Sequence, residues 1–465
     1  MAKAKKGKLT IEDALVPVEE QPYEIPENWC WTTLDMVADY KKGPFGSSIT
    51  KAMFVPKGEN TYKVYEQGNA IRKTVQYGEY YITKEKFEEL KGFEIHPGDL
   101  IVSCAGTIGE TYQLPEIIEE GVINQALMRV KVSEKVDLKY YLYYFDEMLR
   151  QDITGNSKGS AIKNIPPFAV LKKFPYPLPP LAEQKRIVEQ IENLFSKLDE
   201  AKDKAQFVVE SYESRKKAIL HNAFEGLYSA EWRKKNKCSI DDWKDTKINE
   251  VCIPRAGYAF DSKKFTTDGF QIIRMGNLYA GKLDLSRSPV FYDRNDVDDS
   301  ILKRSLVHDG DILLTLTGTK YKRDYGYAVC IEGNPELLVN QRILCLTPTE
   351  KIERDYLLYY LRSEIFRDIF FSNETGGVNQ GNVSSKFVEN IEIKLPSIDE
   401  QKEISRILRT VLDNEERAKD TAEYVIEQID IIKKSILAKA FRGELGTNIA
   451  DDERAIELLK SIIEA

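Results

Sequence analysis

One ten-residue phrase occurs twice in this chain, as LPPLAEQKRI at 178–187 and as LPSIDEQKEI at 395–404, almost half of the 465 residues apart. Other segments repeat in the same order. Among them are FEIHPGDLIVSCAGT (93–107) with SLVHDGDILLTLTGT (305–319), VINQALMRV (122–130) with LVNQRILCL (338–346), KYYLYYF (139–145) with DYLLYYL (355–361), and KKAILHNAF (216–224) with KKSILAKAF (433–441). A constant order of matches along the chain indicates that one ancestral unit was duplicated, so the fold must contain that unit twice.

Each repeat has a mixed first part and a helical second part. Short β-branched runs such as DLIVS and DILLTLT, bounded by PGD and DGD turns, are typical of strands, and a helical stretch follows them. We therefore expect two α/β (α+β) modules in tandem. The predicted boundaries are an N-terminal tail at 1–27, a first module at 28–180, a helix at 181–226, a linker at 227–242, a second module at 243–396, a helix at 397–447 and a C-terminal amphipathic helix at 448–465.

The second part of each repeat carries the spacing of a coiled coil. Prolines near the start of each phrase end the segment before it, and the acidic residues that follow suit the first turn of a helix. Apolar residues then recur at alternating steps of three and four, which predicts a long helix with a packing seam. The predicted seam comprises Ile187, Ile191, Leu194, Leu198 and Val208 in the first helix and Ile404, Leu408, Val411, Val425 and Ile429 in the second. Arg215 and Glu415 interrupt it, and polar seam residues of this kind more often set the register than act chemically.

The chain order favours antiparallel pairing of the two helices. The second module lies between the end of the first helix and the start of the second, so parallel pairing would need a connection running back along the whole pair. We therefore expect an antiparallel coiled coil with one module at each end and a pseudo-two-fold internal repeat.

Composition excludes several classes of protein. The six cysteines lack CxxC spacing and the three histidines are far apart, so neither a disulfide scaffold nor a His/Cys metal site is expected. No apolar run is long enough to span a bilayer and the N-terminus lacks the apolar stretch of a secretory signal, which predicts a cytoplasmic protein without membrane contact. The net charge of −8 means that nucleic-acid binding would need local basic patches or a basic partner.

Catalytic signatures are scarce. No two glycines are separated by a single residue, so the glycine-rich loops that hold nucleotide cofactors are missing from the sequence. The segment NIPPF at 164–168 resembles the Asn-Pro-Pro-aromatic tetrad of adenine methyltransferases, but an isoleucine separates Asn164 from the prolines. A turn before a strand is the better interpretation, and we expect no catalytic residue and no cofactor in this chain.

Several loops combine basic, aromatic and amide residues near turns, the residue types that contact phosphates, base edges and base faces. Solvated loop tips are the simpler explanation for any single residue, and Asn69 and Asn277 could merely form a shared turn. The candidates for DNA contact are Lys41, Lys42, Phe45, Ser47, Ser48, Asn69, Arg72 and Lys73 in the first module and Arg255, Tyr258, Arg274, Asn277, Lys320, Tyr321, Lys322 and Arg323 in the second. For the repeated Asn124-Gln125 and Asn340-Gln341, a buried amide pair that stabilises each module is preferred over contact with bases.

The duplicated phrase LPPLAEQKRI and LPSIDEQKEI, the long helix after each copy and the GPFGSS-like and GNL-like turns before it resemble the specificity subunits of type I restriction–modification systems. The resemblance runs from about residue 25 to residue 445. It implies two target-recognition domains that read the halves of an interrupted DNA sequence, with the helices setting the gap. It also implies a subunit without a catalytic site.

The same resemblance implies the partners. They are double-stranded DNA, two modification subunits and restriction subunits. The modification subunits bind S-adenosylmethionine and methylate adenine, and the restriction subunits cleave. Glu183, Gln184, Glu400 and Gln401 are the candidates for contact with the modification subunits. Two other functions stay open: a self-contained DNA methyltransferase or endonuclease with fused recognition domains, and a coiled-coil adaptor without a role on DNA.

Overall fold

A computed structural model describes residues 10–464 apart from 106, 156–167, 334 and 378. The chain forms two compact units. Unit 1 contains Met1–Asp203 and Val425–Ala465, and unit 2 contains Lys204–Tyr424. Residues 164–167 of the NIPPF segment lie outside the described part of the chain.

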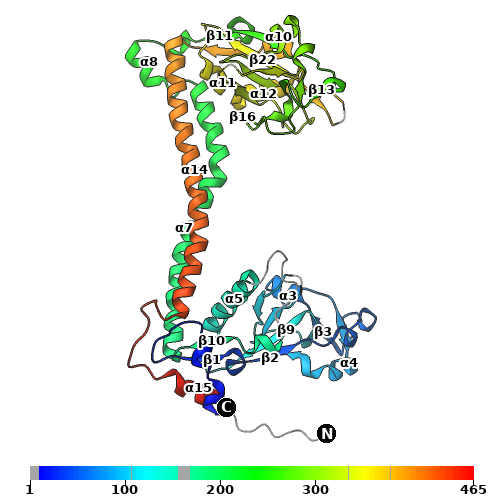
Figure 1. The fold of residues 1–465 in the computed structure, drawn as a ribbon, viewed down its shortest axis with the longest axis vertical. Helices are drawn as coiled ribbons and strands as arrows, with labels where there is room; N and C mark the ends of the chain where they lie inside the picture. Colours follow the sequence, from blue (N-terminus) through cyan, green and yellow to red (C-terminus); the bar gives the residue numbers. More distant parts are fainter. Residues whose placement is uncertain (1–9, 106, 156–167, 334, 378, 465) are drawn as a thin grey trace. The chain divides into compact units, whose positions relative to one another are not determined.

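The first module, in unit 1, is built on two four-stranded sheets (Figure 1). One is antiparallel, with the order β2-β9-β6-β7 (Ala38–Lys42, Leu127–Val132, Leu100–Ser103 and Thr111–Gln113). The other is mixed, with the order β4-β3-β8-β5 (Tyr81–Thr83, Thr61–Tyr65, Gly121–Ile123 and Glu94–Ile95), and β3 runs parallel to β8. A separate ribbon pairs β1 (Cys30–Thr33) with β10 (Pro175–Leu178).

The second module, in unit 2, repeats the antiparallel sheet, the ribbon and three strands of the mixed sheet. Its antiparallel sheet has the order β12-β22-β18-β20 (Cys252–Ala256, Ile343–Pro348, Ile312–Thr315 and Ala328–Cys330). Its mixed sheet has the order β13-β17-β14-β21 (Phe265–Thr266, Phe291–Tyr292, Phe270–Ile273 and Leu337–Val339), and its ribbon pairs β11 (Lys244–Lys247) with β24 (Glu392–Leu395). In the mixed sheets, β17, β14 and β21 pair as β4, β3 and β8 do. The second module also contains two small two-stranded sheets, β15-β16 (Leu278–Tyr279 and Lys282–Leu283) and β19-β23 (Thr317–Gly318 and Gly381–Asn382). The predicted internal repeat and mixed fold class are thus confirmed.

Short helices cover the sheets and connect the strands. In unit 1 these are α1 (Ile11–Ala14), α2 (Leu34–Val37), α3 (Gln67–Ile71), α4 (Lys84–Glu89), α5 (Leu138–Gly155), α6 (Phe168–Leu171) and α15 (Ala455–Glu464). In unit 2 they are α8 (Ala230–Asn236), α9 (Ile248–Val251), α10 (Asp299–Ser305), α11 (Arg354–Arg362), α12 (Glu364–Ser372) and α13 (Ser385–Glu389). The tyrosine-rich segments form α5 and α11, and their aromatic side chains are mostly buried against the modules.

Two helices of equal length follow the repeated phrases, α7 (Leu181–Phe224) and α14 (Ile398–Phe441). Each ends shortly before a glycine in the left-handed region, Gly226 at φ 74° and Gly443 at φ 73°, as is usual after a helix C-terminus. Both helices therefore stop a few residues before the predicted boundaries. The predicted linker at 227–242 is itself partly helical, because it contains α8.

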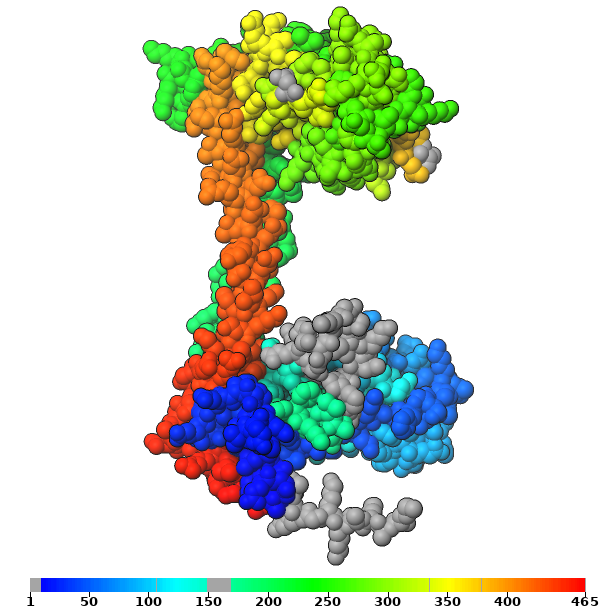
Figure 2. Space-filling model, in the orientation of Figure 1, coloured from blue at the N-terminus to red at the C-terminus, as the bar shows by residue number. Residues whose placement is uncertain are grey.

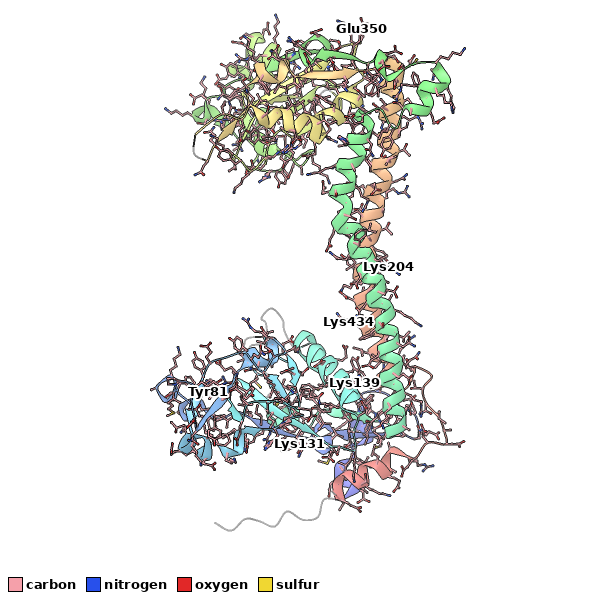
Figure 3. All side chains as sticks on the ribbon, turned by 180° about the vertical axis from the view of Figure 1, so that it is seen from behind. Tyr81, Lys131, Lys139, Lys204, Glu350 and Lys434 are labelled. Carbon is pink, nitrogen blue, oxygen red and sulfur yellow. The ribbon has the colours of Figure 1, made fainter. Side chains whose placement is uncertain are left out.

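In each unit the two long helices pair antiparallel. In unit 1, Lys433 pairs with Asp199, and Lys202 Nζ lies 2.9 Å from Asp430 Oδ1, so numbers rise along α7 as they fall along α14. Lys139 at the start of α5 (Figure 3) pairs with Glu192 of α7 at 2.6 Å and ties the module to the same pair. The predicted direction of pairing is observed.

In unit 2 the two polar seam residues pair with each other. Arg215 Nε donates to Glu415 Oε2 over 2.7 Å, which is consistent with a role in setting the register. The predicted seam needs one correction, at Val425, whose side chain is 36% exposed. Ile426, one residue later, is partly covered, because the seam follows a step of four residues from Ala422 rather than a step of three.

The Gln of each repeated phrase joins the long helix to its module. Gln184 Nε2 donates to the carbonyl of Pro179 over 2.9 Å, and its Oε1 accepts from the backbone N of Asp137 over 2.8 Å. Gln401 makes the equivalent bonds to Pro396 over 2.8 Å and from Glu353 over 2.8 Å. In each module the glutamine side chain thus bonds both to a backbone carbonyl before the long helix and to the backbone N of the residue just before α5 or α11.

The Glu of each phrase accepts from a tryptophan before the ribbon. Trp29 Nε1 donates to Glu183 over 2.7 Å, and Trp243 Nε1 donates to Glu400 over 3.1 Å. The residues that complete each carboxylate's shell follow the end of the other long helix: Asn448 donates to Glu183 over 2.8 Å, and Arg233 donates to Glu400 over 2.7 Å.

Aromatic residues close each junction at the end of the other long helix. The Phe441 ring lies 5.0 Å from Tyr144 and 5.8 Å from Tyr140 in unit 1. In unit 2, Phe224 takes the same place, with its ring 5.2 Å from Tyr356 and 5.5 Å from Tyr360. Each of these four tyrosine hydroxyls donates to a backbone carbonyl of the ribbon strand β10 or β24.

These junctions correct one expectation from the sequence. Glu183, Gln184 and Gln401 are 0% exposed and Glu400 is 2% exposed, so they were wrongly predicted to contact modification subunits. Their hydrogen bonds are satisfied within the chain itself. The spacing that the phrase keeps in both repeats reflects the joining of helix to module.

Unit 1 is completed by both ends of the chain. The backbone N of Ala455 at the start of α15 donates to Asn28 over 2.9 Å, and Ala455 and Leu459 are buried in the same core as Trp29 and Leu34. Figure 2 shows the blue N-terminal residues against the red C-terminal ones. The predicted C-terminal amphipathic helix therefore begins later than residue 448 and packs on the N-terminal segment.

We predict that Gln401→Leu lowers the free energy of unfolding of unit 2 by about 2–3 kcal/mol, because it leaves the buried carbonyl of Pro396 and the partly buried backbone N of Glu353 without their partner. Urea denaturation of the whole chain measures this. The control is Lys402→Leu on the same turn, whose side chain is 64% exposed. Equal stability of the Gln401→Leu variant and the wild type would contradict the role assigned to the amide.

A second prediction concerns pH. Burial raises the pKa of the Glu183 carboxyl, although the hydrogen bonds from Trp29, Asn448 and Thr447 oppose the shift. A carboxyl whose pKa is higher in the folded state contributes most stability when protonated, and that contribution is lost as pH rises through the folded pKa. Glu183→Gln cannot ionise, so its stability relative to the wild type should increase as the pH rises above the ordinary range of a glutamate carboxyl. Urea unfolding at several pH values measures this, with exposed Glu189→Gln as the control; a difference that is constant with pH would refute it.

Candidate nucleic-acid interface

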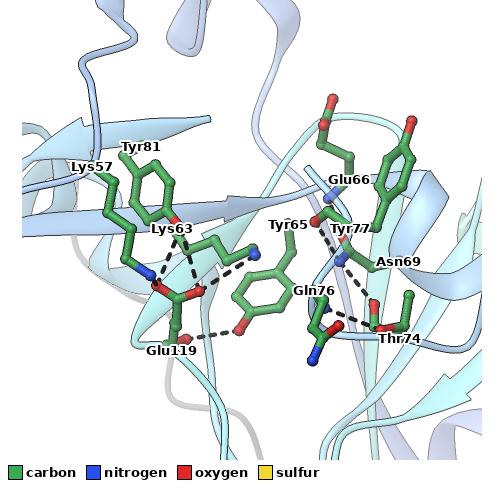
Figure 4. A network of polar contacts seen from close by, with 10 residues as sticks. All are labelled: Lys57, Lys63, Tyr65, Glu66, Asn69, Thr74, Gln76, Tyr77, Tyr81 and Glu119. Carbon is green, nitrogen blue, oxygen red and sulfur yellow. Dashed lines mark hydrogen bonds and ion pairs between the residues drawn. The ribbon is translucent and has the colours of Figure 1, made fainter. Parts of the chain in front are cut away.

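The Gly-Asn pair shared by the two modules closes a turn. Asn69 Oδ1 accepts from the backbone N of Glu66 over 2.8 Å, and its Nδ2 donates to the carbonyls of Thr74 over 3.0 Å and Tyr77 over 2.9 Å (Figure 4). This turn follows β3, the central strand of the mixed sheet. The amide therefore holds a loop of about ten residues at one edge of the module.

Asn277 makes the same three bonds in the second module. It accepts from Arg274 over 2.9 Å and donates to Asp284 and Arg287 over 2.9 Å each. Asn69 is 0% exposed and Asn277 is 3% exposed. The prediction that these two residues contact DNA was wrong, because their side-chain amides are buried and form hydrogen bonds with the backbone of the turn.

A second repeated asparagine brings further loops to the same edge. The backbone N of Asn124 donates to Tyr65 over 2.9 Å, directly before the first turn, and the N of Asn340 donates to Ile273 over 3.0 Å. Each side chain also accepts from the backbone two residues on, at Ala126 over 3.0 Å and at Arg342 over 3.2 Å. The neighbouring Gln125 and Gln341 are exposed, so the expected buried amide pair is wrong for the glutamines.

The loop after β2 or β12 passes close to that second asparagine. A methyl group on Gly43 would lie 1.8 Å from the carbonyl oxygen of Asn124, and one on Gly257 would lie 2.2 Å from that of Asn340. Only glycine permits this approach. The loop after β6 or β18 joins as well, since Cys104 N donates to Ala126 over 2.8 Å and Leu316 N donates to Arg342 over 3.0 Å. Four loops thus converge at one edge of each module, which we call the loop edge.

In the first module most of the candidates lie exposed on the loop edge. Phe45 is 87% exposed, and Lys41, Lys42, Ser47 and Arg72 are exposed, whereas Ser48 is partly covered. The Arg72 guanidinium lies 4.8 Å from the centre of the Tyr77 ring. Lys73 is exposed but pairs with Glu110 over 3.0 Å.

In the second module the loop at 317–327 presents an aromatic ring and a lysine. Tyr321 is 82% exposed and Lys322 is exposed. Tyr321 and Arg323 have left-handed φ values of 67° and 52°, a conformation that is costly for residues with side chains. Hydrogen bonds hold the loop in this form: Tyr321 N donates to Glu374 over 3.1 Å, and Lys320 Nζ donates to the carbonyl of Gly376 over 2.9 Å.

Three of the remaining candidates in the second module are engaged within it. Arg255 pairs with the buried Asp311 and donates to the carbonyl of Leu306, so its prediction as a DNA contact is corrected. Asp311 also accepts from the backbone N of His308, and Asp99 accepts from that of His96 in the first module, so both carboxylates have a structural role. Tyr258 packs its ring 5.0 Å from Phe260, and Arg323 pairs with Asp368 over 2.8 Å.

Two arginines on the loop edge were missed in the sequence, Arg287 and Arg342. Both are exposed and line a cleft beside Arg274 and Asn277. Arg342 stands two residues after the repeated Asn340, where the first module has Ala126. A comparison of the residues that flank each shared asparagine would have revealed Arg342, but Arg287 lies in a loop without matching letters between the repeats.

Comparison with known proteins agrees with this arrangement. A family model described as "Type I restriction modification DNA specificity domain" matches the chain twice, over residues 26–206 and 240–424. The chain belongs to this family. The two matches include both modules together with parts of the long helices, as the duplicated phrase indicated.

Relatives cover most of the chain. The specificity subunit of the type I restriction enzyme EcoBI from Escherichia coli is 25% identical over 76% of this chain and 75% of its own length. That of MjaVIII from Methanocaldococcus jannaschii is 25% identical over 90% and 94%. The crystal structure of the HsdS subunit from Thermoanaerobacter tengcongensis superposes with a TM-score of 0.62 at 17% identity, over 92% of this chain and 100% of that one, which supports the fold. The homology supports a specificity-subunit role for this chain.

Among the described residues, no helix is both long enough and apolar enough to cross a membrane.

We predict that Asn277→Ala destabilises unit 2 by about 1–3 kcal/mol, because it removes three hydrogen bonds inside a buried turn. Backbone amides at 284–288 should exchange faster with solvent, while the sheet amides keep their protection. Hydrogen exchange measures both, with the exposed Asn295→Ala as the control. Unchanged exchange at 284–288 would show that the turn does not depend on Asn277.

Proposed function

We propose that this chain is the DNA-reading subunit of a type I restriction–modification complex. Each module binds one half of an interrupted double-stranded DNA sequence through its loop edge. The observation that carries the proposal is the construction of the loop edge twice, on the same two asparagines, with exposed cations and aromatic rings on it. These are the side chains that contact phosphates and bases.

The charge of the loop edge fits this role, although the chain as a whole is acidic. Lys41, Lys42 and Arg72 in the first module, and Lys322 in the second, form no ion pair with any described residue. Charged groups left unpaired on one edge lower the cost of approach of a polyanion. The net charge of −8 is then carried by other surfaces of the chain.

Methyl transfer and cleavage come from partners in this proposal. Two modification subunits bind S-adenosylmethionine and methylate adenine, and restriction subunits cleave where they are present. The missing glycine-rich cofactor loop in this sequence supports that division. The modification subunits dock on surfaces other than the buried Glu183, Gln184, Glu400 and Gln401.

The test uses the full-length chain with and without its modification subunit. We expect methylation of DNA by a labelled methyl donor only when both are present, at an interrupted motif that mapping of the methylated bases identifies. Methyl transfer by the purified chain alone would favour the self-contained methyltransferase. Absence of salt-dependent DNA binding by the complete complex would favour the adaptor.

Charge removal at the loop edge sharpens the test. Lys41→Ala with Lys42→Ala should weaken binding to all DNA sequences alike and lower the slope of log K against log salt by about one unit for each phosphate that is no longer neutralised. The matched control is Lys86→Ala, because Lys86 is already paired with Glu89 at 2.6 Å. An unchanged salt slope in the double variant would place the phosphate-binding cations elsewhere.

A further inference from the structure

The same turn is filled in one module and open in the other. In the first module, the ring of Tyr77 lies over Gly68, where a methyl group would come within 2.0 Å of the Tyr77 Cε1 atom. In the second module, a methyl group on the equivalent Gly276 would meet no described atom within 4 Å. Figure 4 shows Tyr77 beside Glu66 and Asn69 on the closed turn.

The open turn forms a cleft of about 380 Å³ in the second module. Gly276, Asn277 and Asn340 line it, together with the three arginines Arg274, Arg287 and Arg342. All of these residues belong to unit 2, on the loop edge described above. The cleft is therefore a cationic hollow at the place where the first module carries its own aromatic ring.

Backbone hydrogen bonds identify the counterparts of the three arginines. Arg274 and Glu66 both donate their backbone N to the shared asparagine, and Arg287 and Tyr77 both accept from it. Arg342 and Ala126 both donate their backbone N to the second asparagine. Three guanidinium groups thus replace a carboxylate, a phenol and a methyl on one scaffold.

The guanidinium groups have unused donors. Among the described residues, none of Arg274, Arg287 and Arg342 forms an ion pair within 4.0 Å. Arg274 donates one Nη to the carbonyl of Ser288 over 2.6 Å, while its buried Nε has no partner. The pKa of the Asp284 carboxyl is lowered mainly by hydrogen bonds from the hydroxyl and backbone N of Ser286, and the charge of Arg287 adds a smaller effect.

In the first module, the position equivalent to Arg274 is unfavourable for a negative charge. Burial raises the pKa of the Glu66 carboxyl, against the charge of Lys63, so this position disfavours an anion. With Tyr77 closing the turn, the first module lacks the space to receive an acceptor there, although the Arg72 guanidinium lies 4.8 Å from the centre of the Tyr77 ring.

We propose that the Gly276 cleft is a specificity-determining subsite of the second module that binds a pair of neighbouring acceptors on DNA. The acceptors are the O6 and N7 atoms of a guanine or two oxygens of a phosphate, the groups that a guanidinium binds in pairs. The subsite rests on the proposed function and adds to it a physical reason for unlike half-sites: the first module occupies the equivalent place with Tyr77.

Two kinds of variant test the subsite in the complete complex with its modification subunit. Arg342→Ala removes donors and leaves the backbone bond of residue 342 intact. Gly276→Leu fills the cleft and keeps every arginine, and the open space and ordinary φ at Gly276 let the variant fold. Arg294→Ala, outside the cleft and paired with Glu336, is the control. DNA libraries randomised in each half-site, read by methylation and by binding at several salt concentrations, supply the measurements.

For a guanine, Arg342→Ala should weaken binding about 10- to 100-fold for one base of the second half-site and relax the choice of that base. For a phosphate, the loss should be equal for all sequences and the salt slope should fall by about one unit. Gly276→Leu should weaken binding in either case and leave the choice of bases in the first half-site unchanged.

The subsite is overturned if both variants match the wild type in affinity, base preference and salt slope while the wild-type complex binds DNA. It is also overturned if Arg294→Ala reproduces their effects. Failure of the wild-type complex to bind DNA at all would instead refute the proposed function. Thermal unfolding of each variant shows whether a loss of binding reflects loss of the fold.

Discussion

The hydrogen bonds made by the Glu-Gln pair at the start of each long helix position each module. The glutamine side chain bridges the proline carbonyl before the helix and the first backbone amide of α5 or α11, and the glutamate holds a tryptophan. The glutamate and glutamine side chains are buried and their partners are buried or partly buried, so removing one partner leaves another unsatisfied. This coupling fixes where each module begins relative to the helix that follows it in the chain.

The last turns of the other long helix and the segment after it complete each junction. Phe224 and Phe441 pack against equivalent tyrosines. Arg233 and Asn448 donate to equivalent glutamates, although arginine and asparagine are different residue types. Antiparallel pairing brings the end of one helix beside the start of the other within each unit. Duplication of the ancestral unit therefore allowed each copy to be completed by residues of the other.

The loop edges show how one scaffold can carry two different surfaces. The side chains of Asn69 and Asn277, like those of Asn124 and Asn340, form hydrogen bonds with backbone groups. The side chains at the flanking positions are therefore free to vary. In the first module Tyr77 covers the shared glycine, whereas three arginines surround the open glycine in the second. Because the framework is bonded through the backbone, such substitutions change the recognition surface without changing the turn.

Sequence alone determined the duplication, the mixed modules, the two long helices and their antiparallel pairing, because repeat order and 3–4 spacing are properties of the chain itself. It did not distinguish a buried polar residue from an exposed one. Glu183 and Asn277 were predicted as contact residues, and tertiary structure buries both among hydrogen-bond partners of the same chain. Arg287 and Arg342 lie in loops distant in sequence, and only the tertiary structure shows that they line the same cleft. Burial and convergence depend on packing, which local sequence patterns do not encode.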